Sequence, residues 1–414
     1  MTHRRDDGLL RQDGEPHWLL PVLLVLGAGA VSQGLARFAL AACLPAMTQD
    51  LLGSYTAAGW MGAANLGAYF LGVLVQARMP SSIDPGLILR IGLLVTTASM
   101  LVVGLAPNVW IVGIGTALGG FFGAAVWMQC SAIVAGHTPS HRRGLAFGMT
   151  TAGIGGAIAI TSALAAWAAR ADLYSAWRPV WLIEAGIAAL ILVANLLFLP
   201  PTRRPPSTSS RMPLDEVLPG WRRLLASYFL YGASYSLFTS FLVEALHVDV
   251  GLSVVSATHA YSLLGLAAIF GGLVLGRVSD VLGRKQVLSG AILITGLAAF
   301  VVPLGSLGVT WPVIPAALAF GLSMSGMGTV LMAHISDLAP AGHVSQALAT
   351  VTLGFGIAQF LVPPVGGHLA DALGRFGPTY VVAALLGVAA AFFAAILPTH
   401  SRTLDTRPAM SEQS

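Results

Sequence analysis

The chain has 414 residues, of which 56% are hydrophobic and only 9% are charged, and its formal net charge at pH 7 is +4. Soluble domains carry roughly 25% charged residues, so this composition excludes a soluble globular protein. The basic residues are scattered singly through short polar segments rather than gathered on one face, so no nucleic-acid partner is expected.

Twelve apolar runs are separated by glycine, proline or charged residues, and each is long enough to cross a membrane as a helix. The sequence therefore predicts an all-α polytopic membrane protein with two six-helix bundles. The first six spans are expected at 18–46, 55–77, 86–106, 109–135, 144–169 and 177–200. The last six are expected at 222–246, 253–276, 286–308, 312–335, 346–370 and 377–398.

A linker divides the spans into two sets. The stretch Pro200–Arg223 combines six prolines with five arginines and several serines, which is typical of a linker. The apolar run that begins at Trp18 is longer than the core of a signal peptide, so we expect it to be retained as a helix. The predicted organisation is a cytoplasmic tail over 1–17, a first bundle over 18–200, a cytoplasmic linker over 201–221, a second bundle over 222–398 and a cytoplasmic tail over 399–414.

The distribution of basic residues predicts the orientation in the membrane. With both termini in the cytoplasm, seventeen of the twenty-one Lys and Arg residues lie in cytoplasmic segments. Arg170, Arg178 and Arg375 lie outside, and Arg37 lies within a helix. We therefore predict a multi-pass protein of a bacterial inner membrane with both termini inside.

The two halves also resemble each other in sequence. A segment from Pro139 aligns with one from Pro340 at a constant offset of 201, which pairs Thr151 with Thr352. Two halves related by an axis along the membrane normal could rock about a site at the midplane, which is the physical basis of alternating access.

The most specific motif follows the eighth predicted span, where Gly276, Asp280, Gly283, Arg284 and Lys285 have the spacing G-x-x-x-D-x-x-G-R-K. It resembles a loop motif of the major facilitator superfamily. The resemblance implies the major facilitator fold, secondary transport and a conformational latch at these residues. In such a latch Asp280 packs against the positive N-terminal end of a helix in the opposite half.

Other segments extend the resemblance over the whole chain. The stretch R-G-x-A-x-G begins at Arg143 and Gly144, which we expect to form a second cytoplasmic loop motif. The first-half equivalent of the latch has Gln76 in place of the acidic residue, so a symmetric latch is not expected. The fourth and fifth spans lack the arginine and the Gly-Pro pair of drug/proton antiporters, which disfavours multidrug efflux. The segment around Arg37, together with Leu44–Met47, Gln359 and Pro363-Pro364, is similar to the YbfB/YjiJ-type branch.

Arg37 is the first candidate for substrate binding. A charge at the centre of a bilayer costs at least about 2.5–3.5 kcal/mol unless it faces water. Arg37 could bind an anion such as a carboxylate, with Gln33 one turn earlier on the same face. Alternatively, it lies nineteen residues after Trp18, or about 28 Å of helix, and could extend to the outer headgroups. We favour the binding role.

Aromatic and amide residues supply further candidates. Tyr231 and Tyr235 belong to a stripe on the seventh span with helical spacing, and the resemblance places this span beside the cavity. A packing role for the stripe stays open. Asn65 and Tyr69, one turn apart on the second span, are weaker candidates for substrate binding.

The titratable residues in the spans have two interpretations. Glu184 could carry a coupling proton, but the sixth span is usually peripheral in this superfamily, so we favour a structural role for Glu184 and likewise for Glu244. His137 and His141 have i,i+4 spacing without further ligands nearby, so no metal site is predicted. Cys43 and Cys130 are interpreted as packing residues, and no cofactor is expected.

The sequence predicts a transporter rather than an enzyme. It has no phosphate-binding loop, no GxSxG and no HExxH. We predict a monomeric secondary transporter in the lipid bilayer that moves a small organic anion, a carboxylate, with proton coupling or exchange. The alternatives are efflux of apolar or cationic compounds, and a sensor or scaffold that keeps the fold without flux.

Overall fold

The computed structural model describes residues 18–76, 78–80, 82–139, 142–171, 177–202, 212–340 and 343–398. Within these ranges the chain forms helices and no strand, and twelve helices are long and apolar enough to cross a membrane. The predicted all-α polytopic architecture is therefore confirmed. The predicted tails and the centre of the predicted linker lie outside the described residues.

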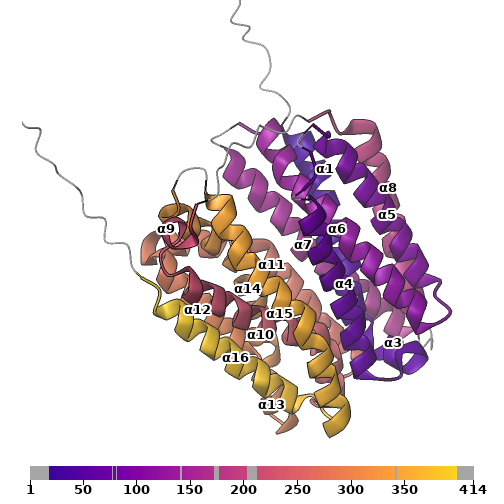
Figure 1. Ribbon diagram of the computed structural model, residues 1–414. Coiled ribbons are helices and arrows are strands. Elements are labelled where there is room, and N and C mark those ends of the chain that lie inside the picture. The colour runs from indigo at the N-terminus through magenta and orange to yellow at the C-terminus, as the bar shows by residue number, and fades with distance from the viewer. Residues whose placement is uncertain are drawn as a thin grey trace, which may run out of the picture.

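The N-terminal half consists of the first six spans (Figure 1). The first span is built from α1 (Leu19–Gly29), a π-helical segment (Ala30–Leu35) and α2 (Ala36–Ala42). The short helix α3 (Leu44–Met47) and a second π-helical segment (Thr48–Leu52) continue it. The other five spans are α4 (Tyr55–Gln76), α5 (Pro85–Gly104), α6 (Val109–His137), α7 (Arg143–Arg170) and α8 (Trp177–Phe198).

The C-terminal half follows the short helix α9 (Leu214–Val217) and lies beside the first half in Figure 1. Its third span, Arg284–Ser306, contains α12 (Arg284–Ala298) and α13 (Val301–Ser306). The other five spans are α10 (Trp221–Val248), α11 (Val254–Leu282), α14 (Val313–Leu338), α15 (Val344–Leu373) and α16 (Gly377–Ala395). We call the end of the molecule that carries α9 the linker end, and the opposite end the α3 end.

Side-chain caps and glycines set where several spans begin and end. Asn108 accepts the amide of Ile111 at 3.1 Å at the start of α6, and Ser253 caps α11 in the same way. The predicted end of the eighth span at residue 276 is wrong, because α11 continues to Leu282. It stops at Gly283, whose φ of 95° is a conformation that a residue with a side chain rarely adopts.

Close backbone contacts between glycines join the two halves at mid-membrane. A Cβ atom at Gly155 of α7 would lie 2.6 Å from the carbonyl oxygen of Gly265 of α11, and one at Gly265 would lie 2.8 Å from the carbonyl oxygen of Gly155. Any larger residue at either position would push the helices apart. Small residues permit this approach, as is common where membrane helices cross.

A second pair of helices, α4 and α15, joins the halves towards the α3 end. A Cβ atom at Gly59 of α4 would lie 2.5 Å from the carbonyl oxygen of Pro363 of α15. Gly367, one turn further along α15, lies directly against the backbone of Tyr55. In Figure 1 these two helices run alongside each other.

Candidate functional site

Arg37 lies between two cavities at the boundary between the halves. It is the second residue of α2 and lies two residues after the π-helical segment, a rare geometry that often occurs at functional sites. The α3-side cavity has a volume of about 50 Å³ and the linker-side cavity about 170 Å³, and both are half open. Arg37, Phe38 and Tyr235 line both cavities.

Residues of both halves line the linker-side cavity. The first half contributes Gln33 and Arg37 from the first span and Thr151, Ile154 and Gly155 from α7. The second half contributes an aromatic wall and small polar groups. These are Tyr228, Tyr231, Tyr235, Ala268, Met324, Ser325, Gly328 and Phe355.

The guanidinium of Arg37 points to the interface between the halves. Its Nη2 donates a 3.0 Å hydrogen bond to Oε1 of Gln359, which is the sixteenth of the thirty residues of α15. Arg37 therefore meets the middle of the opposite half rather than a helix end. Within the described residues it has no ion pair with a carboxylate, and its hydrogen-bond partner is a neutral amide.

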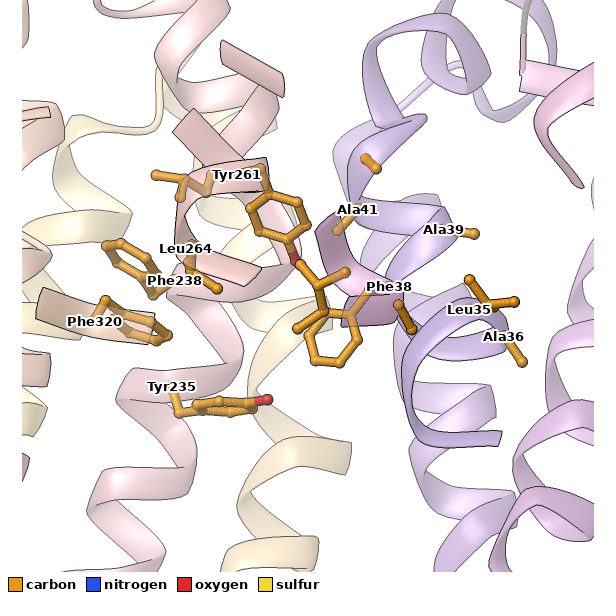
Figure 2. Close-up of a cluster of buried hydrophobic side chains, with 14 of the residues drawn as sticks. Leu35, Ala36, Phe38, Ala39, Ala41, Tyr235, Phe238, Tyr261, Leu264 and Phe320 are labelled. Atoms are coloured by element: carbon orange, nitrogen blue, oxygen red, sulfur yellow. The ribbon is translucent and has the colours of Figure 1, made fainter. Parts of the chain in front are cut away.

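The aromatic residues form a stack beside Arg37. Tyr231 stacks on Phe355 with ring centroids 5.6 Å apart, and Tyr228 stacks on the same ring at 5.0 Å. The structure gives the hydroxyl groups of these two tyrosines, and that of Tyr235, no hydrogen-bond partner among the described residues. In Figure 2 the Tyr235 hydroxyl points towards the helix that carries Phe38.

A tightly packed aromatic cluster lies on the α3 side of Tyr235. Phe238 and Phe320 stack with centroids 3.9 Å apart, and Phe38 reaches across to Tyr261 at 6.5 Å (Figure 2). Phe38 belongs to the first half and Tyr261 to the second, so this contact lies at the boundary between the two cavity-lining halves.

The other predicted site residues differ in their position relative to Arg37 and the cavities. Gln33 lines the linker-side cavity with Arg37, and its amide lies 3.5 Å from the carbonyl of Gly123. Asn65 is buried and donates a 2.9 Å hydrogen bond to the backbone of Thr116, so its amide nitrogen is used for helix packing. Tyr69 lies within the electrostatic reach of Arg37 but lines neither cavity.

Carboxylates join the halves at the α3 end. Asp371 of α15 accepts the backbone amides of Tyr55 and Thr56 at 2.9 and 2.8 Å, and the Thr56 hydroxyl at 2.6 Å. These are the first residues of α4, so a carboxylate of one half caps a helix of the other. The Tyr55 hydroxyl also donates to buried Glu244 at 2.9 Å. We call these bonds the α3-end contact.

The predicted latch residues lie at the opposite, linker end. Gly276 and Asp280 are in the last turns of α11, and Asp280 pairs with Arg284 at 2.5 Å within the same half. Arg284 also lies 3.5 Å from Asp337 at the end of α14. Lys285 follows in the first turn of α12. A contact of Asp280 with the opposite half stays a prediction for another conformation.

The remaining motif residues have local roles. Arg143 donates to the carbonyls of Ala135 and Thr138, so it caps the C-terminal end of α6 with positive charge. Gly144 has open space where a Cβ atom would stand. Gln76 is buried and accepts a 3.0 Å hydrogen bond from Gln129 within the first half.

Sequence reasoning missed two residues of the interface. Gln359 belongs to the family resemblance but was not predicted as a site residue, although an amide in an apolar span is a usable signal. Asp371 had no signal beyond its charge near a helix end. The predicted packing cysteines are buried and free, His137 contacts the carbonyl of Ile133, and His141 lies outside the described residues.

Comparison with known proteins agrees with this architecture. The solved D-xylose-proton symporter superposes with a TM-score of 0.73 at 16% identity, covering 92% of this chain and 98% of that one. A bacterial homologue of the human lysosomal transporter Spinster, in an inward-facing and occupied conformation, superposes with a TM-score of 0.70, with 92% and 94% coverage. At this identity the likeness concerns the fold.

Curated relatives match shorter stretches. Human monocarboxylate transporter 6 is 31% identical over 136 residues, which is 32% of this chain and 26% of that protein. The multidrug resistance protein MdtG of Salmonella choleraesuis is 26% identical over 223 residues, 51% of this chain and 53% of that protein. The matches thus span about a quarter to a half of these relatives.

The family model described as "Uncharacterised MFS-type transporter YbfB" matches residues 29–398, from the end of α1 to beyond the last span. This range contains both cavities, Arg37 and the α3-end contact. The chain therefore belongs to the YbfB-type family of major facilitator superfamily transporters, a family of multi-pass membrane proteins rather than of enzymes.

Proposed function

We propose that this protein moves a small monocarboxylate across a bacterial inner membrane by alternating access, with Arg37 as the anion-binding residue. The observation that carries the proposal is the Arg37 guanidinium, which is bonded across the interface to Gln359 and lines both cavities without a carboxylate partner in the described residues. A partly buried cation without a counter-charge is costly, and a bound anion would supply that charge.

The surroundings of Arg37 favour an anion with an apolar body. A guanidinium can bind a carboxylate through two parallel hydrogen bonds, which fixes its orientation. The stack of Tyr228, Tyr231 and Phe355 offers a flat apolar surface beside it. The free tyrosine hydroxyls can donate to further oxygen atoms. Human monocarboxylate transporter 6 matches this chain over 26% of its own length, and its name agrees with this substrate class.

The conformation corresponds to one step of the cycle. The distribution of basic residues assigns the linker end to the cytoplasm, with both termini inside. The α3-end contact then holds the halves together on the outer side, while the linker-side cavity extends from Arg37 towards the cytoplasm. We interpret this arrangement as inward-facing. Rocking about the α7–α11 contact would exchange it for an outward-facing one.

The test is uptake of radiolabelled solutes by proteoliposomes of the full chain, with a panel of monocarboxylates, dicarboxylates and organic cations, because symport of one proton with one monocarboxylate moves no net charge. We expect uptake of one or more monocarboxylates, loss of uptake in Arg37→Ala and partial retention in Arg37→Lys. The matched control is Arg78→Ala, which removes an equal charge from a side chain that donates to the Leu74 carbonyl within the first half.

Two results would contradict the proposal. Wild-type rates of monocarboxylate transport in Arg37→Ala would remove the role of the arginine. Transport of cations alone would favour efflux of cationic compounds, although an uncompensated guanidinium in the cavity wall repels such substrates. Binding of a monocarboxylate without any uptake of the labelled solute would indicate a sensor or scaffold with this fold.

A further inference from the structure

A carboxyl group lies deep within the N-terminal half, away from both cavities that Arg37 lines. Glu184 of α8 is 0% exposed. The hydroxyl of Thr161 on α7 donates to its Oε1, whereas Oε2 has no hydrogen-bond partner among the described residues. An ionised carboxylate with a buried, unpaired oxygen is costly, and a proton on Oε2 removes that cost.

The neighbouring helices supply no cation to balance this carboxyl group within the described residues. The basic residues on the helices packed against it lie near helix ends and are bonded there. They are Arg90 of α5, Arg143 and Arg170 of α7, and Arg178 of α8. Among the described residues, the buried thiol of Cys43 is a titratable neighbour of Glu184. Glu184 is therefore not one half of a structural ion pair.

A small cavity approaches Glu184 from the α3 end. This cavity, which we call the Cys43 cavity, is a small half-open hollow with a volume of about 30 Å³, and it is lined by Cys43, Ala165 and Val180 among others. Ala165 lies one turn beyond Thr161 on α7, and Val180 lies one turn before Glu184 on α8. One helical turn is about 5.4 Å, so the wall of the Cys43 cavity lies about one helical turn from the Glu184–Thr161 pair.

The same cavity connects Glu184 with the elements that move during transport. Its wall includes Val254, the first residue of α11, so the opposite half forms part of it. Cys43 directly follows α2, the seven-residue helix that carries Arg37 near its start. The proposed anion site and Cys43, a neighbour of Glu184, thus lie at the two ends of one short helix.

We propose that Glu184 binds and releases the proton that is coupled to substrate movement, exchanging it with water in the Cys43 cavity. A hydronium ion gives its proton to Oε2 and leaves as water, and release reverses this step. The inference rests on the proposed transport function. It changes the interpretation of the sequence, which favoured a structural role for Glu184.

A substrate-independent measurement tests the proton site directly. Infrared difference spectra of the full chain in lipid nanodiscs, recorded over a pH titration, report the carbonyl band of a protonated carboxyl group. We expect a pH-dependent band of which one component is lost in Glu184→Gln and kept in Glu244→Gln, the matched control at a second buried carboxylate whose Oε2 likewise has no partner among the described residues. A Glu184→Gln spectrum that loses no component of the wild-type band, or a wild-type spectrum without a pH-dependent band, would overturn the proposal.

A second variant guards against misfolding of the first. Thr161→Val leaves the carboxyl group in place but removes its hydrogen bond, so the same band should move to higher frequency. An unchanged band frequency in Thr161→Val would assign the band to another group and would also overturn the proposal.

Transport then tests the coupling, with whichever monocarboxylate the wild-type protein takes up. Glu184→Gln should retain exchange of labelled for unlabelled solute and lose accumulation driven by a pH gradient. Wild-type accumulation in Glu184→Gln would overturn the proposal. If the wild-type protein moves no carboxylate, the proposed function has failed, and the infrared titration still decides the proton site.

Discussion

The bonds of Asp371 to α4 should set the balance between the two conformations of this transporter. Asp371→Ala removes the acceptor for two backbone amides and one hydroxyl of the opposite half. Loss of a helix cap costs about 1 kcal/mol, in a range of about 0.5–2 kcal/mol. Because Asp371 is exposed, water replaces part of what is lost. A change of about 1 kcal/mol shifts a two-state equilibrium by a factor of about 5.

Distance measurements between spin labels can detect this shift. Leu105 and Leu307 lie on opposite halves at the α3 end and are 67% and 80% exposed, so cysteines there can be labelled. The two native cysteines are buried. In Asp371→Ala the population with a longer distance between the two labels should grow by about fivefold or more relative to the unsubstituted protein.

Asp249→Ala is the matched control. Asp249 also accepts two backbone amides at the start of a helix at the α3 end, those of Phe376 and Gly377 at 2.9 and 2.6 Å, but all three residues belong to the second half. This variant should lower stability without changing the label distance. An unchanged distribution in Asp371→Ala, or an equal shift in Asp249→Ala, would refute the reasoning.

Three further predictions concern the same interface and the end of α11. Gly155→Val should abolish transport by separating α7 from α11, whereas Gly156→Val, where a Cβ atom meets open space, should retain transport in the same liposome assay. Gly283→Ala should lower the unfolding free energy by about 1 kcal/mol because of its positive φ, and Gly290→Ala should not, as measured by thermal unfolding in detergent. Tyr55→Phe leaves Glu244 without its hydroxyl donor at a cost of about 1–3 kcal/mol. The spin labels at positions 105 and 307 should therefore again separate, and an unchanged distance between them would contradict this expectation.

The fold could be predicted from the length and hydrophobicity of the apolar runs, because each span must satisfy its own backbone hydrogen bonds in lipid and must be about 20 residues long. All twelve spans were therefore predictable. Arg37 could also be chosen as a candidate site residue, because it is a charge within a span. The ends of spans were less so. The apolar run ends at Gly276, just before Arg277, and the eighth span is predicted to end there. The helix itself continues beyond these charged residues and ends before Gly283, whose φ is positive.

Contacts between the halves could not be predicted from one sequence. The partner of Arg37 lies 322 positions away in Gln359, and that of Tyr55 lies 316 positions away in Asp371. Such pairs depend on how two rigid bundles meet, which no local pattern encodes. The motif at Asp280 predicted a carboxylate capping a helix of the opposite half, and in this conformation Asp371 makes that kind of bond at the other end.

The glycine contact between α7 and α11 has a consequence for the size of the movement. Gly155 lies fifteen residues from the Arg170 end of α7 and twelve from its Arg143 end, or about 22 Å and 18 Å at 1.5 Å per residue. A rotation about this point works as a lever with nearly equal arms. Each ångström of separation gained at one surface of the membrane therefore corresponds to about an ångström of approach at the other, and the two openings exclude each other by geometry alone.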